Sequence, residues 1–130
     1  MSAYTLANVR DAEDSAARRG LEGKVEGRML RSLLDSQELG ISLFRYAPGY
    51  RSQHGHHHET QEEAYVVVGG SGRVKLDEDI VELALWDVLR VAPEVVRGFE
   101  AGPDGLELIA VGGRRPEGGD GKMVPDWWTA

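Results

Sequence analysis

From Val25 onward, short apolar runs alternate with segments rich in glycine, proline and aspartate. The runs are four to six residues long: Met29–Leu34, Ile41–Tyr46, Ala64–Val68, Arg73–Leu76, Ile80–Leu83, Val88–Val91, Val95–Phe99 and Leu106–Val111. The segments between them are typical of turns, and they include Pro48-Gly49, Gly69–Gly72, Asp77–Asp79, Ala92-Pro93 and Gly102–Gly105. Short strands at this spacing, with no long amphipathic helix, predict an all-β sandwich or barrel.

The two ends of the chain differ from this pattern. Residues 1–24 are polar and rich in alanine, arginine and glutamate, which predicts an N-terminal arm with one loose helical turn. Residues 114–130 form a glycine-rich tail that ends in Trp127-Trp128. We expect this tryptophan pair to pack against the barrel or against a second subunit, because two adjacent indoles are too apolar for water. The expected organisation is one domain over residues 1–130, with a barrel core at about 28–113.

Composition narrows the classes of function. The 130 residues are 41% hydrophobic and 28% charged, as in a globular domain. A net charge of −7 argues against nucleic acid and acidic membrane surfaces as partners. The chain has no cysteine, so thiolate chemistry and disulfides are excluded. With no apolar run near the roughly 20 residues of a membrane span, and no signal-peptide pattern, a soluble cytoplasmic protein is expected.

All four histidines lie within residues 54–58 and are followed by paired carboxylates. Alternate side chains of a strand share a face, so His56 and His58 are expected to point together and His57 away from them. On the next strand, Glu63 lies on one face and its neighbour Glu62 on the other. Two imidazoles and one carboxylate therefore converge, and these donors suit a divalent ion of Fe, Mn, Ni or Zn.

Other interpretations of these residues stay open. A polar histidine loop can simply be solvated, and His54 shares the parity of His56 and is a possible substitute ligand. Tyr65 lies on the face of Glu63, where it either lines the pocket or belongs to the core. Gly69–Gly72 is expected to be a turn and not a phosphate loop, because neither a helix nor a lysine follows it. Asp77–Asp79 is expected to be a hairpin turn, since it lacks the ligand spacing of a calcium loop.

From about Arg28 to Gly113 the sequence resembles the small single-domain bacterial cupins. The first cupin motif is glycine, five residues, His-x-His, three or four residues, glutamate, six residues and glycine. Here Gly49 is followed by six residues, His56-His57-His58, four residues, Glu63, six residues and Gly70. The resemblance implies a double-stranded β-helix, a jelly-roll barrel of two antiparallel sheets. It also implies that His56, His58 and Glu63 bind a metal at the open end.

The second cupin motif fits in spacing but not in residues. It normally supplies a fourth metal ligand, a histidine, and Arg97 stands in that place. Arginine cannot ligate a metal, because it has no accessible lone pair. Three interpretations follow: Arg97 binds an anionic group of the substrate beside the metal, it replaces the metal and pairs with Glu63, or it points outward to solvent.

Two hypotheses on function follow from these residues. One is a barrel that holds a divalent metal ion and a small, anionic molecule, working as a metal-dependent enzyme of the isomerase or dioxygenase type, with Arg97 and Tyr65 binding the ligand. The other is a metal-free barrel that binds a small molecule without catalysis. In either case a homodimer is expected, because pairing of subunits covers exposed edge strands.

Overall fold

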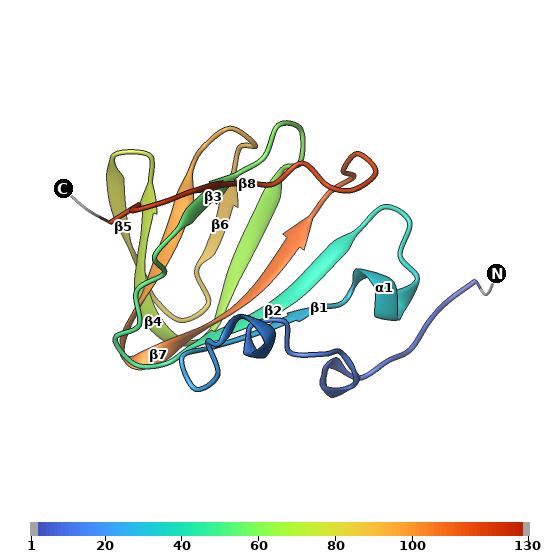
Figure 1. Cartoon of the computed structure of the whole chain (residues 1–130), viewed down its shortest axis with the longest axis horizontal. Coiled ribbons are helices and arrows are strands. Elements are labelled where there is room, and N and C mark those ends of the chain that lie inside the picture. Colours follow the sequence, from blue (N-terminus) through green and yellow to red (C-terminus); the bar gives the residue numbers. More distant parts are fainter. Residues whose placement is uncertain (1–2, 129–130) are drawn as a thin grey trace.

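The computed structural model describes residues 3–128 and consists mainly of antiparallel strands (Figure 1). The strands are β1 (Val25–Met29), β2 (Gly40–Tyr46), β3 (Gly55–His57), β4 (Glu63–Leu76), β5 (Asp79–Leu83), β6 (Val88–Val91), β7 (Arg97–Gly112) and β8 (Lys122–Val124). The helical segments are short: η1 (Val9–Asp11), η2 (Ala17–Arg19) and α1 (Arg31–Leu34). No helix within residues 3–128 has the length and apolar character to span a membrane.

The two longest strands, β4 and β7, run antiparallel to each other and belong to both halves of the barrel. The first half of β4 and the second half of β7 lie between β6 and β2, and β1 follows β2. The other halves lie between β5 and β3, and β8 follows β3. The expected jelly roll of two curled antiparallel sheets is therefore confirmed.

Glycines mark where β4 and β7 bend from one sheet to the other. The register between the two strands shifts at Val67/Gly69 and at Gly70/Gly72. Gly70 has a φ of +67°, and a side chain there would overlap the carbonyl of Gly105. The predicted turns at 69–72 and 102–105 are thus wrong, because these glycines bend two continuous strands instead of ending them.

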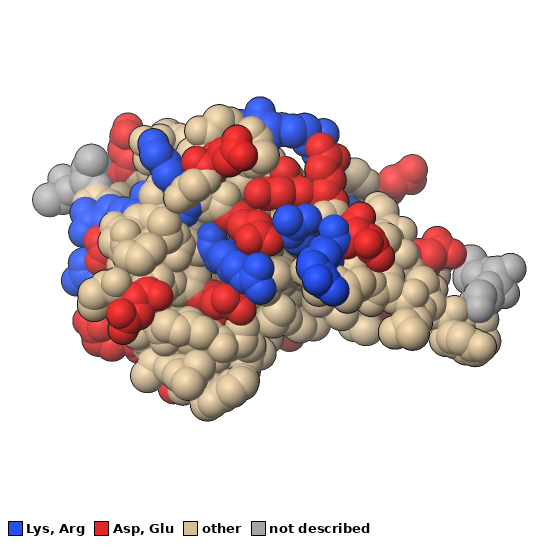
Figure 2. Space-filling view, turned by 90° about the horizontal axis from the view of Figure 1, so that it is seen from below, with Lys and Arg blue, Asp and Glu red and all other residues tan. Residues whose placement is uncertain are grey.

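The N-terminal part also differs in detail from the expectation. The run Met29–Leu34 is not a strand, because β1 ends at Met29 and α1 forms one helical turn directly after it. The first 24 residues contain the two 3-10 turns η1 and η2, where one loose turn was expected. A backbone bridge between Asp14 and Arg28 joins this arm to β1, and the Asp14 carboxylate accepts the N–H of Gly27. Exposed acidic and basic side chains are interspersed on the face shown in Figure 2.

The core lies between the two sheets and consists mainly of alternate residues of β4 and β7, with Leu83 of β5 and Val91 of β6. Its fully buried aliphatic members are Val67, Val74, Leu106 and Leu108. The tryptophan pair packs against the barrel, which was one of the two expected arrangements. The indole of Trp127 donates to the carbonyl of Lys75 at 3.1 Å. It lies against Gly55 and Gly98, where any side chain would collide with the ring.

Candidate metal-binding site

Two histidines and a glutamate meet between the sheets at one end of the barrel. His56 lies on β3 opposite Arg97 of β7, and His58 follows one residue after that strand. Glu63 is the first residue of β4, opposite Gly112 of β7. One ligand atom from each of His56, His58 and Glu63 lies within 4.8 Å of the others, so the three could hold a metal ion.

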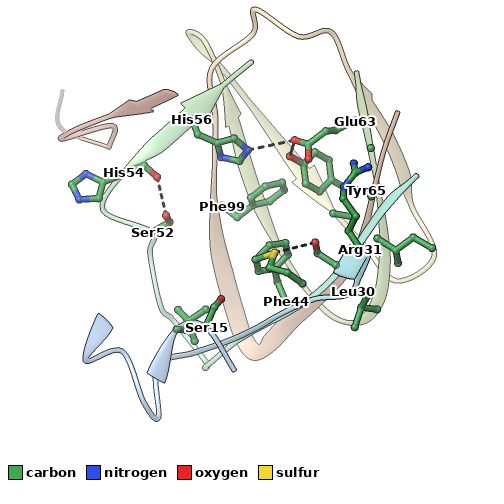
Figure 3. Close-up of a pocket in the computed structure, with 18 of the residues that line it drawn as sticks. Ser15, Leu30, Arg31, Phe44, Ser52, His54, His56, Glu63, Tyr65 and Phe99 are labelled. Carbon is green, nitrogen blue, oxygen red and sulfur yellow. Dashed lines mark hydrogen bonds and ion pairs between the residues drawn. The ribbon is translucent and has the colours of Figure 1, made fainter. Parts of the chain in front are cut away.

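One oxygen of Glu63 is the centre of this group. Oε1 lies 3.1 Å from Nε2 of His58 and 3.4 Å from Nε2 of His56, and it accepts the Tyr65 hydroxyl at 2.6 Å. Figure 3 shows His56, Glu63 and Tyr65 directed toward one another. Burial alone would raise the pKa of Glu63, but the hydrogen bonds from the two histidines and the tyrosine hold this pKa well below its usual range. Glu63 is therefore an anion at neutral pH, as ligation requires.

The second nitrogen of His58 is held by Asp120, a residue of the C-terminal tail. Nδ1 of His58 lies 2.8 Å from one carboxylate oxygen of Asp120. The other oxygen accepts the backbone N–H groups of Glu59, Thr60 and Gln61 and the Thr60 hydroxyl. These bonds tie the tail to the turn between β3 and β4. They also direct Nε2 of His58 at Glu63, as an outer carboxylate does for a metal-bound histidine.

A cavity of about 460 Å³ opens beside this group. The volume is typical of a small-molecule site. Its lining includes His56, His58, Glu63 and Tyr65, together with apolar side chains such as Phe44. Tyr65 is buried, and burial together with the charge of Glu63 raises its pKa well above the usual value, so the hydroxyl keeps its proton.

Arg97 is completely buried and lies behind Glu63. One terminal nitrogen, Nη1, donates to the carbonyl oxygens of Val95, Pro93 and His56 at 2.8, 3.3 and 3.4 Å. The other, Nη2, lies 3.7 Å from Oε1 of Glu63, an ion-pair distance without a hydrogen bond. The interpretation of Arg97 as a surface residue is wrong. Arg97 is not among the residues that line the cavity, and its binding of a ligand stays a prediction.

The remaining histidines lie outside the group. His57 pairs with Lys122 of β8 and points to the opposite face from His56, as strand alternation requires. His54 is exposed at the rim of the cavity, and Figure 3 shows its ring well away from Glu63. Neither belongs to the set of converging ligand atoms among residues 3–128.

Known structures have the same arrangement of strands. A cupin protein from Bacteroides fragilis is 23% identical and superposes with a TM-score of 0.71 over 89% of this chain and 88% of that one. An RmlC-like cupin from Shewanella frigidimarina is 21% identical, with a TM-score of 0.64 over 90% and 98% of the two chains. The chain has the cupin fold. One chain from the crystal structures of the DMSP lyases RdDddP and RnDddQII also matches, at 17% identity and a TM-score of 0.67 over 93% of this chain and 61% of that one.

Comparison of the sequence with family models and with curated proteins found no match. The first cupin motif, in which the residues fit, provides the converging His56, His58 and Glu63. The second motif, in which only the spacing fits, places Arg97 on β7 opposite His56 of β3, where its guanidinium is completely buried.

Asp120 should affect metal affinity through His58, whose orientation it fixes, without touching the metal. Replacing Asp120 with asparagine removes the negative charge that directs His58, and loss of such an outer partner typically costs about 10–100-fold in affinity. We expect a weakening of Mn(II) binding in that range by titration calorimetry. Asp104→Asn, at an exposed position of β7, is the matched control and should bind Mn(II) as the unmodified protein does. Equal affinity of the two variants would contradict the role of Asp120.

Metal binding should also depend on pH through His58. The hydrogen bond to Glu63 and the one to Asp120 raise the pKa of His58, against the opposite effects of burial and Arg97. Without metal, His58 thus keeps its proton above the ordinary histidine pKa of about 6.5. A metal must displace this proton, so Mn(II) affinity should still increase with pH above about 6.5. Titrations with Mn(II) at several pH values above about 6.5 measure this increase. A constant affinity over that range would contradict the role of His58.

Proposed function

We propose that this protein binds one divalent metal ion through His56, His58 and Glu63, and a small anionic molecule in the adjoining cavity. The observation that carries the proposal is the convergence of three ligand atoms within 4.8 Å at the wall of a cavity of about 460 Å³. Two imidazole nitrogens and a carboxylate oxygen are donors that suit Fe, Mn, Ni or Zn. Asp120 supports the set, because it fixes the orientation of His58.

The residues of the proposed site have different roles. His56 and His58 come from β3 and its end, so their spacing is set by the strand, and Glu63 approaches from the start of β4. Tyr65 lies at the cavity wall and donates its hydroxyl to Glu63 at 2.6 Å, and in this proposal it also contacts the bound ligand. Gln61 is buried beside Glu63 and offers an amide to the same cavity.

A bound metal would supply Lewis acidity or oxygen activation at this end of the cavity. Both chemistries fit the donor set, so the reaction we propose is of the isomerase or dioxygenase type. The DMSP lyases show that this fold can carry enzymes. Fold alone does not select a reaction, so the case for catalysis rests on the metal ligands and Tyr65.

One observation favours a second candidate, a metal-free binding barrel. Nη2 of Arg97 lies 3.7 Å from Oε1 of Glu63, and the guanidinium is completely buried. A buried cation beside a buried carboxylate can balance its charge without a metal. In this alternative the same cavity binds its ligand without turning it over.

Metal analysis separates the two candidates. Purified without a histidine tag, the protein should contain up to one transition-metal ion per chain. After removal of this metal with a chelator, it should bind one equivalent of Mn(II). Replacing Glu63 with glutamine should abolish the uptake, while Glu62→Gln, on the exposed face next to it, should not. A chain that takes up no Mn(II) at millimolar concentration would refute the metal site and favour the binding barrel.

The homodimer expected from the sequence remains a prediction. Trp127 and Trp128 pack on their own barrel, so the prediction of a homodimer does not rest on them. Among the described residues 3–128, strand β5 pairs with β4 alone, and it carries exposed Ile80 and Val81. Exposed Trp86 and Val88 follow in the next turn and on β6. Edge strands of this kind are commonly covered by a second subunit. Light scattering should give the mass of two chains, and a clean monomer at high concentration would contradict it.

A further inference from the structure

The cavity has an excess of positive charge in a chain that is acidic overall. Its lining residues of fixed charge are Glu63 and the three arginines Arg19, Arg31 and Arg115. Glu63 is already engaged by His56, His58, Tyr65 and Arg97. By contrast, the side chains of the three arginines make no hydrogen bond or ion pair with any residue within 3–128. Most arginines outside the cavity, such as Arg28, Arg45 and Arg73, are paired with a glutamate.

Arg31 is the arginine that the fold positions best. It is half-buried and is the first residue of α1, a turn fixed to β2 by the bond from Leu30 N–H to the Ile41 carbonyl. Its terminal nitrogen Nη2 lies over Gly40, only 2.6 Å from where a β-carbon would stand. The absence of a side chain at Gly40 is therefore what lets the guanidinium lie on this part of the sheet.

The sheet register relates Arg31 to the metal ligands. Gly40 pairs with Gly112, and Gly112 pairs with Glu63, so the three side-chain directions share one face. Across this row the backbones of Gly40 and Glu63 are two strand spacings apart, roughly 10 Å. Gln61 covers Gly112 between them. Figure 3 shows Arg31, Tyr65 and Glu63 on the same side of the cavity.

We infer that Arg31 is the anion-binding residue of this cavity, and that the ligand is a small organic acid with two separate polar ends. One end carries oxygen atoms that reach the Glu63 group, and the other carries a carboxylate or phosphate that pairs with Arg31. A guanidinium binds either anion through two parallel hydrogen bonds, which gives strength and direction. The inference rests on the proposed function, since it names the ligand class of the same cavity. It also assigns the anion to Arg31 and not to Arg97.

Calorimetry with matched acids tests this inference on the Mn(II)-loaded protein. 2-Hydroxyglutarate has a hydroxy-acid head and a carboxylate tail, and 2-hydroxyvalerate has the same head and chain length with an uncharged tail. The first should bind at least about tenfold more tightly, as a charge-assisted pair provides. 3-Phosphoglycerate, with a similar head and a phosphate tail, shows which of the two anions is preferred. Absence of any preference for a charged tail would overturn the inference.

Variants then assign the preference to one side chain. Arg31→Gln should abolish it, and Arg31→Lys should retain part of it. Gly40→Ala keeps the charge but moves the guanidinium, so it should reduce the preference as well. Arg90→Gln removes an exposed arginine that pairs with Glu62 outside the cavity, and it should change nothing. If Arg31→Gln and Gly40→Ala both keep the full preference, Arg31 does not bind the anion.

The metal can be tested separately from Arg31. Arg31→Gln should bind Mn(II) as the unmodified protein does, because Arg31 is not a ligand. The tail preference should also persist, with weaker binding of both acids, in chelator-treated protein. Failure to bind Mn(II) with an intact, Arg31-dependent preference would refute the metal site and support the inference. Normal Mn(II) binding without that preference would support the metal site and refute the inference.

Discussion

Replacing His58 with alanine should weaken Mn(II) binding by more than about 100-fold, beyond the 10–100-fold that loss of an outer partner costs. His58 contributes more than one ligand atom to the site. It also links Glu63, 3.1 Å from its Nε2, to Asp120, 2.8 Å from its Nδ1. The variant therefore loses a donor and leaves the Asp120 carboxylate without its imidazole partner. Titration calorimetry on metal-stripped protein measures the change.

His57→Ala is the control for this prediction. His57 neighbours His58 in sequence, but it pairs with Lys122 on the opposite face of β3, and it does not line the cavity. Its removal should leave Mn(II) affinity within about twofold, as expected of a group that makes no contact with the metal. Equal losses from His57→Ala and His58→Ala would mean that the affinity comes from the histidine loop as a whole and not from one face of the strand.

The convergence of His56, His58 and Glu63 could be predicted because strand geometry is local. Side chains alternate between faces every residue, so the spacing of His56 and His58 was enough to separate both from His57. Glu63 followed in the same way from the phase of the next strand. The glycines at 69–72 and 102–105 were misread because a turn and a bend in a continuous strand use the same residue types. Only the pairing of β4 with β7 distinguishes them, and pairing is not local.

Asp120 shows what local patterns cannot reveal. It lies 62 residues from His58, in a glycine-rich tail without recognisable periodicity. Its role depends on the path of the tail, which β8 joins to β3 and Trp127 fixes over Gly55 and Gly98. Arg31 was missed for a similar reason. Its run looked like a strand, whereas α1 folds its side chain back over Gly40.

The binding of an anionic ligand by Arg97 stays a prediction. Its guanidinium is completely buried, and three backbone carbonyls accept hydrogen bonds from Nη1. Nη2 of Arg97 lies 3.7 Å from Oε1 of Glu63. Arg97 and a metal bound by Glu63 would therefore compete for the same carboxylate. Substitutions of Arg97 therefore test whether the protein binds a metal or is a metal-free barrel.

Replacing Arg97 with histidine should strengthen divalent-metal binding by about tenfold or more. A metal bound by Glu63 would lie close to the guanidinium, and two unit charges roughly 4–6 Å apart repel by about 3–4 kcal/mol at an effective dielectric of 20, for each unit of charge on the ion and before solvent screening. The substitution removes this repulsion. It also adds a neutral imidazole on the strand beside His56, with its side chain on the same face.

Arg97→Met separates these two effects, because methionine removes the charge without adding a nitrogen donor. We expect Mn(II) affinity to decrease from the histidine variant to the methionine variant to the unmodified protein. Titration calorimetry on metal-stripped samples measures it. Circular dichroism should confirm that both variants are folded, since each loses the hydrogen bonds of Nη1 to the carbonyls of Val95, Pro93 and His56. If both folded variants bind Mn(II) more weakly than the unmodified protein, Arg97 holds Glu63 in place for the metal instead of competing with it. The metal-free alternative would then lose the observation that favours it.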